Sequence, residues 1–85
     1  MSNNTIMRKI DVTDEYQPLS NLRVIGSVTI SCPPENTENV FFKGDSGEDV
    51  PWVPGEWHDF QRICLEDVFV KGTEGDSITV VGGTW

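Results

Sequence analysis

The sequence predicts an all-β protein, a small antiparallel β-sandwich or flattened barrel with two related hairpins. Valine, isoleucine and threonine supply 23 of the 85 residues and alanine is absent, which favours strands because β-branched side chains lose rotamer freedom in helices. Apolar and polar residues alternate along several segments, as they do in strands with one buried face. A strand–turn–strand pattern also occurs twice, and 8 glycines and 5 prolines supply turn residues.

The beginning of the chain predicts an arm, a strand and a loop. Residues 1–5 are polar and predict a flexible N-terminal arm, whereas residues 6–85 are expected to form a single β domain. Residues 6–12 alternate roughly and predict a strand at the edge of a sheet. Residues 13–21 are polar and contain a proline, so we expect a loop there, or a single helical turn at Asp14.

The middle of the chain predicts strands separated by proline-containing turns. Residues 22–31 alternate most regularly, and Gly26 on their apolar face indicates a bulge or the close approach of another backbone. Residues 32–39 contain two consecutive prolines, which remove ladder donors, and predict a surface loop. Residues 51–56 predict an edge strand that ends in a type II turn, because glycine follows proline where φ must be positive. Residues 57–63 predict the next strand.

The repeated pattern lies in residues 40–50 and 68–78, which match 28 positions apart in a Val-Phe strand, a Lys-Gly pair and a second glycine. Two copies are too few for a solenoid, which needs at least three repeats to bury a continuous core. We therefore expect two related hairpins, joined through a short link in which Leu65 points inward. The inward face of the hairpins predicts a core of Val40, Phe42, Val68, Val70, Ile78 and Val80.

The charge balance excludes several classes of partner. The chain has 6 basic and 14 acidic residues and a net charge of −8, so we expect no binding to nucleic acid or to an anionic membrane. The N-terminal residues lack the apolar stretch of a signal peptide, which predicts synthesis and retention in the cytoplasm unless the protein leaves within an assembly. Cys32 and Cys64 are then expected to be reduced thiols that pack as small apolar side chains.

Two short patterns contain residue types that could carry chemistry. Residues 45–49 gather three carboxylates around a glycine, but their spacing departs from the EF-hand loop and is typical of a solvated hairpin turn. His58 lies next to Asp59 without an accompanying nucleophile motif, and it is the only histidine, so a zinc site would lack ligands. The sequence therefore predicts no catalytic, cofactor-binding or metal-binding residue.

Three tryptophans in so small a chain are expected to fill the core, to anchor an interface, where tryptophan is enriched, or to stack on sugars. Phe41 and Phe69 occupy equivalent positions in the two copies, so we expect them on one outward face. That face is covered either by a second sheet or by another subunit. The candidate interface residues are Phe41, Phe69, Trp52 and Trp57, and they predict self-association, with a homotrimer as the expected state.

Residues 28–83 resemble the small β-rich virion proteins of tailed bacteriophages, particularly capsid decoration (cement) and head-fibre proteins. The resemblance lies in the loop at residues 31–39, the strand at residues 40–44, the Pro54-Gly55-Glu56 turn and the strand-and-turn pattern of residues 65–81. It covers about two-thirds of the chain and involves turns and strands without an active-site signature.

Membership of this group implies a β-sandwich or barrel without enzymatic activity. It also implies a structural protein located on the capsid surface of the virion, where many copies bind the major capsid protein, often as trimers, and stabilise the head. The same pattern occurs in proteins of phage tails and fibres. The alternative function is therefore a tail- or fibre-associated module that binds a carbohydrate or another receptor through its tryptophans.

Overall fold

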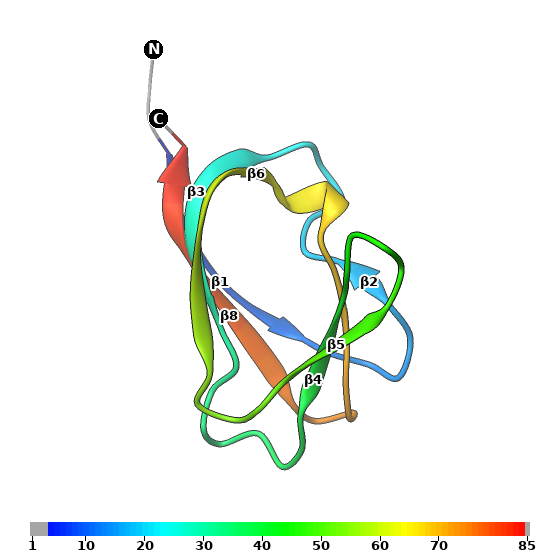
Figure 1. The fold of residues 1–85 in the computed structure, drawn as a ribbon. Helices are drawn as coiled ribbons and strands as arrows, with labels where there is room; N and C mark the ends of the chain where they lie inside the picture. Colours follow the sequence, from blue (N-terminus) through cyan, green and yellow to red (C-terminus); the bar gives the residue numbers. More distant parts are fainter. Residues whose placement is uncertain (1–3, 85) are drawn as a thin grey trace.

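Two four-stranded antiparallel sheets pack against each other in the computed structural model, which describes residues 4–84 (Figure 1). The fold is a small β-sandwich, as predicted, and within these residues the sheets do not close into a barrel. The first sheet, sheet A, has the order β1 (Asn4–Asp11), β8 (Ser77–Thr84), β3 (Ile25–Ser31) and β6 (Trp57–Cys64). The second, sheet B, has the order β2 (Gln17–Pro18), β7 (Phe69–Lys71), β4 (Val40–Lys43) and β5 (Asp49–Trp52).

The N-terminal segment forms an edge strand of sheet A, as its alternation predicts. Strand β1 begins at Asn4, so Asn4 and Thr5 belong to the sheet and not to the predicted arm, while residues 1–3 lie outside the described residues. The predicted loop that follows contains the short strand β2 and no helical turn at Asp14. Pro18 is tolerated in β2 because this strand is the edge of sheet B, where a missing N–H breaks no ladder.

The repeat folds in two different ways, so the prediction of two related hairpins is wrong for the second copy. In the first copy, the N–H of Gly44 donates to the carbonyl of Glu48 over 2.7 Å and closes the β4–β5 hairpin. In the second copy, the N–H of Gly72 donates to Thr13 over 2.7 Å, and the carbonyl of Asp76 accepts from Val12 over 3.1 Å.

The chain between β1 and β2 thus takes the hydrogen-bonding positions that would close a second hairpin. Strand β7 consequently stays in sheet B, and β8 crosses to sheet A. This arch connects the two layers of the sandwich.

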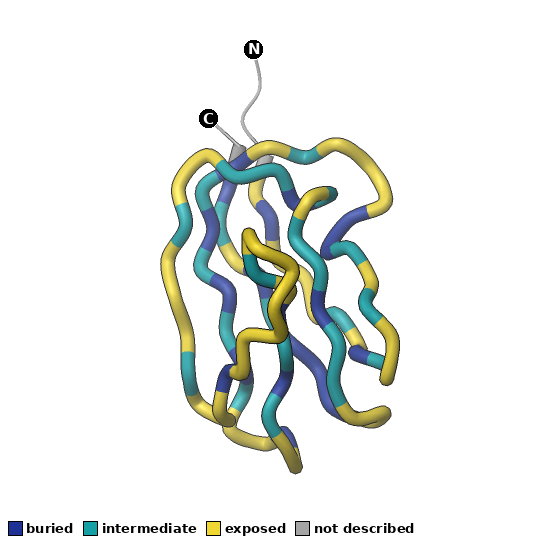
Figure 2. Tube along the Cα trace, turned by 45° about the vertical axis from the view of Figure 1, so that its right-hand side comes forward, coloured by how far each residue is buried: buried dark blue, intermediate teal, exposed yellow. Residues whose placement is uncertain are grey.

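The core lies between the sheets, and the buried residues follow the strands while the turns are exposed (Figure 2). Five of the six predicted core residues are buried, and Val68 is partly buried against them. Leu65 is fully buried at the start of a short 3-10 helix, η1 (Leu65–Asp67), as expected. Within the described chain, none of the helices is long and apolar enough to span a membrane.

Two glycines allow β3 and β8 to approach closely. A Cβ atom at Gly26 would lie 2.6 Å from the carbonyl oxygen of Gly83, and one at Gly82 would collide with the backbone of Ser27. The pairing of β3 with β6 also shifts register next to Gly26, where Arg62 adopts a positive φ of 54°. Both alternatives that Gly26 indicated, a bulge and a close approach, are therefore confirmed.

Candidate interaction surface

The structure separates the four residues of the predicted interface. Trp52 is only 6% exposed, so its inclusion in an interface is wrong. It lies opposite Val40 in the β4–β5 pair and points into the core, where its ring centroid is 4.2 Å from that of Phe42. Trp57, by contrast, is 59% exposed.

Phe41 and Phe69 both lie on the outer face of sheet B, because their neighbours Phe42 and Val70 point inward as a pair. They share a face, as the repeat predicts, but both are half-buried and do not form an open apolar patch. Lys43 extends over the Phe69 ring, with its Nζ 6.0 Å from the ring centroid. The lysine thereby makes this face partly cationic.

Tyr16 completes this surface, which we name the aromatic–lysine face and define as Tyr16, Phe41, Lys43, Phe69 and Lys71. The Nζ of Lys71 lies 4.8 Å from the centroid of the Tyr16 ring, and that of Lys43 lies 5.9 Å from it. The two lysines occupy equivalent positions in the repeat, so their shared face is visible in the sequence. Tyr16 lies in the connection between β1 and β2, and no pattern in the sequence indicates that it belongs to this face.

Asp49 contacts both Tyr16 and Lys71 on this face. It accepts a hydrogen bond from the Tyr16 hydroxyl and lies 3.2 Å from the Nζ of Lys71. Burial of the phenol, together with the hydrogen bond and the negative charge of Asp49, raises the pKa of Tyr16 to about 12. The same hydrogen bond, followed by that from Lys71, lowers the pKa of the Asp49 carboxyl.

A second exposed region surrounds the turn between β5 and β6, which we name the Pro54 turn and define as residues 53–56. The N–H of Glu56 donates to the carbonyl of Val53 over 3.0 Å, and Gly55 has a φ of 93°, as the predicted type II geometry requires. The Glu56 carboxylate accepts from the N–H of Val53 over 3.0 Å. Both ends of the turn are therefore closed by hydrogen bonds.

His58 is hydrogen-bonded to this turn, whereas its neighbour Asp59 is hydrogen-bonded to another strand. Its Nε2 lies 2.6 Å from the carboxylate of Glu56, whereas Asp59 accepts from the hydroxyl of Thr29. The hydrogen bond from His58, followed by that from the N–H of Val53, lowers the pKa of the Glu56 carboxyl. The arrangement is suited to fixing a loop, because each polar group is used by a neighbour within the fold.

One cluster of acidic and sulfur-containing side chains lies beside η1. Cys64, Glu66 and Asp67 place one ligand atom each within 4.8 Å of one another beside η1, but this is the only observation that points to an ion among the described residues. In the acidic turn of residues 45–49, Asp49 is engaged by Tyr16 and Lys71. Cys32 is buried and, like Cys64, is a free thiol.

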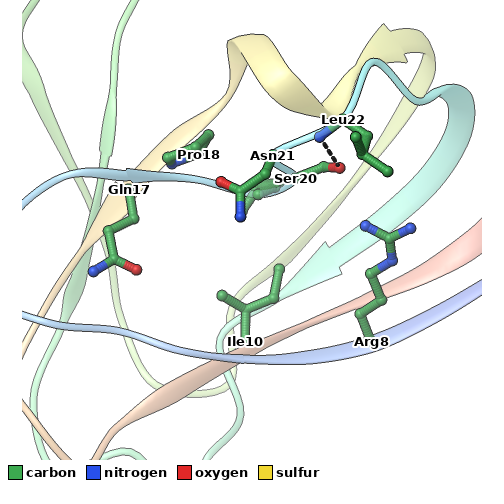
Figure 3. Close-up of a pocket in the computed structure, with 8 residues that line it drawn as sticks. Arg8, Ile10, Gln17, Pro18, Ser20, Asn21 and Leu22 are labelled. Carbon is green, nitrogen blue, oxygen red and sulfur yellow. Dashed lines mark hydrogen bonds between the residues drawn. The ribbon is translucent and has the colours of Figure 1, made fainter.

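A pocket with a volume of about 520 Å³ lies between β1 and the segment of residues 17–22 (Figure 3). Arg8 and Ile10 rise from β1 toward this segment, which carries the amides of Gln17 and Asn21. Arg8, Gln17 and Asn21 are all exposed, so the pocket is an open depression at the side of the sandwich.

Comparisons of the chain with protein-family models, with curated proteins and with solved structures find no match.

Proposed function

We propose that this protein is a non-catalytic structural protein of a bacteriophage virion, which binds the outer capsid as a decoration (cement) protein and stabilises the head. Its partners are the major capsid protein and further copies of itself. The proposal combines the resemblance of residues 28–83 to such proteins with the distribution of apolar side chains on the surface of the sandwich.

The observation that carries the proposal is the exposure of large apolar side chains on the outer face of sheet A and at the turn before β6. Met7 and Val81 are 71% and 49% exposed and lie opposite each other on the outer face of sheet A. Val53 and Trp57 are 52% and 59% exposed at the Pro54 turn. Single exposed apolar residues are common, but several on the outer face of sheet A and at the turn that leads into β6 favour a subunit that is covered there by another protein.

The aromatic–lysine face is the proposed contact between copies. Phe41 and Phe69 supply apolar area there, and Lys43 supplies a positive charge in a protein of net charge −8. A neighbouring copy offers many carboxylates to this lysine. The face therefore suits self-association, for which a homotrimer is the proposed state.

The proposal is tested by counting copies in particles. Virions produced by cells that carry the gene are purified by density gradient, and the protein is quantified against the major capsid protein by mass spectrometry. A decoration protein is expected at roughly one copy per few capsid subunits, whereas a tail or fibre component is present in few copies. Absence of the protein from purified virions would reject the proposed function.

One observation favours a second candidate, a tail- or fibre-associated module that binds carbohydrate. Trp57 presents an exposed indole on the outer face of sheet A, opposite Ser31 in the pairing of β6 with β3. An exposed aromatic ring beside hydroxyl groups is suited to stacking on a sugar. Low copy number in virions, together with quenching of tryptophan fluorescence by host-surface polysaccharide, would favour this function.

A further inference from the structure

We infer that the Pro54 turn, together with Trp57, is a preformed docking site for a partner protein whose groove is apolar at its centre and lined with lysine or arginine at its rim. The inference deepens the proposed function and rests on it for the identity of the partner, which is then the capsid shell. It rests on the rigidity of the turn, the apolar side chains that it exposes, and the charges around it.

The turn is held more firmly than an exposed loop requires. Besides its two internal closures, the N–H of Gly55 donates to the carbonyl of Cys32 over 2.7 Å, and the N–H of Cys32 donates to the carbonyl of Glu56 over 2.8 Å. Trp52, directly before the turn, is fixed in the core between Phe42 and Phe60.

The side chains of the turn itself remain largely outside the core, so its bonding holds surface residues in place. Val53 is 52% and Trp57 59% exposed, and Pro54 is exposed between them. Proline has a fixed φ, and the backbone around it is already ordered, so little conformational entropy is lost on binding. Tryptophan is also the side chain that most often dominates the energy of protein interfaces. These properties fit insertion into an apolar groove.

The surrounding charges specify the rim of that groove. Residues 53–61 contain no lysine or arginine but two acidic residues, Glu56 and Asp59. Glu56 belongs to the turn, and Asp59 is exposed two residues beyond Trp57. Basic side chains complement this surface, whereas a second copy docking through the same turn would oppose like charges. Two copies therefore do not meet turn to turn, and the proposed partner at this site is the capsid shell.

A polysaccharide fits the site less well than a protein groove does. Trp57 offers a ring for stacking, but Val53 and Pro54 offer no side-chain hydrogen bonds to hydroxyl groups. A sugar-binding role is accordingly an outcome that the experiment distinguishes.

The test uses a photo-crosslinking amino acid in the full chain, expressed in cells that produce the particles. It replaces Val53 in one variant and Leu22 in the matched control. Leu22 is 74% exposed and lies before β3, at the opposite end of this strand from Cys32, to which the Pro54 turn is hydrogen-bonded. Crosslinks from position 53, but not from position 22, are expected to the capsid protein, at a peptide that contains lysine or arginine.

A binding measurement accompanies the crosslinking. Purified Val53→Asp and Trp57→Ala are expected to rebind to particles that lack the protein roughly tenfold more weakly, or worse, than the parent, with Leu22→Asp unchanged. Circular dichroism and thermal melting of each variant establish that it is folded. If a variant fails to fold, the position 53 crosslink alone decides.

The outcomes separate this inference from the proposed function. If the protein is in the particle but Val53→Asp binds like the parent and position 53 does not crosslink, the inference is overturned and the function stands. Crosslinks from position 53 to a basic groove of a protein absent from particles would support the docking site and reject the capsid function. If only Trp57→Ala loses particle binding and the parent protein binds host polysaccharide, the inferred contact with a protein groove is overturned. If the protein neither crosslinks nor binds to particles, both proposals are rejected.

Discussion

At the scale of single residues, Phe42 illustrates how the repeat directs side chains inward. It is 6% exposed and stacks against Trp52, which itself contacts His58 and Phe60. Phe42→Ala is expected to lower the free energy of unfolding by about 3–5 kcal/mol, because it removes buried apolar area and leaves a cavity. Urea denaturation measures this loss. Phe41→Ala, at the neighbouring half-buried position, is the matched control and should cost less; equal losses would contradict the assignment of faces.

Tyr16 provides a second prediction at this scale, because it is the only tyrosine of the chain. Its pKa is raised to about 12 in the folded protein, through burial and through the carboxylate of Asp49. The neutral phenol is therefore favoured by the fold, and this contribution to stability is present below pH 10 and lost as the pH rises toward 12. Ultraviolet absorbance of the tyrosinate measures the midpoint directly.

Asp49→Asn is the control for this titration. It removes the charge but retains the burial of the ring, so the midpoint should fall toward, without reaching, the value of the urea-unfolded chain. A midpoint for the parent equal to that of the unfolded chain would contradict the placement of Tyr16 against Asp49.

At the scale of elements, the alternation of residues 22–31 predicts β3, which begins at Ile25, and the turn residues after Trp52 predict the turn between β5 and β6. Local sequence determines these features because a strand's face pattern and a turn's φ are properties of consecutive residues. That the second repeat copy forms no hairpin was not predictable from consecutive residues. It depends on two residues that are distant in sequence. Val12 donates a hydrogen bond to Asp76, and Thr13 accepts one from Gly72.

The residues of the candidate surfaces likewise include some whose placement follows from local sequence and some whose placement depends on distant residues. Outward positions for Phe41 and Phe69 follow from strand alternation, and the exposure of Trp57 is consistent with its prediction as an interface residue. Core filling is one of the predicted roles of the tryptophans, but its assignment to Trp52 depends on pairing with Val40 and on the approach of Phe60 from the other sheet. Tyr16 was missed because nothing in a loop sequence indicates which sheet face it will cover.

The contact between β3 and β8 yields the prediction for this scale. Gly82→Ala places a methyl group against the backbone of Ser27, where a neighbouring strand cannot yield as a flexible side chain can. We expect the free energy of unfolding to fall by about 1–3 kcal/mol, as for other overpacked sites. Thermal melting measures the change, with Val81→Ala at the adjacent exposed position as control. A Gly82→Ala protein as stable as Val81→Ala would contradict the close approach of the two strands.

At the scale of the whole molecule, the account predicts self-association through the aromatic–lysine face. Apolar contacts survive high salt, whereas contacts between charges weaken as the Debye length shortens. Sedimentation of the purified protein in low and high salt should show an oligomer, expected to be a trimer, in both conditions. Phe41→Ser with Phe69→Ser should dissociate it, while Val81→Ser on the opposite sheet should not. A monomer in both salts would reject this contact.

The proposed decoration of a capsid can be observed by cryo-electron microscopy of purified virions. We expect a β-sandwich at many symmetry-related positions on the outer shell, with the Pro54 turn directed toward the capsid protein and the aromatic–lysine face toward neighbouring copies. A shell without such density, or a sandwich confined to the tail or its fibres, would contradict it.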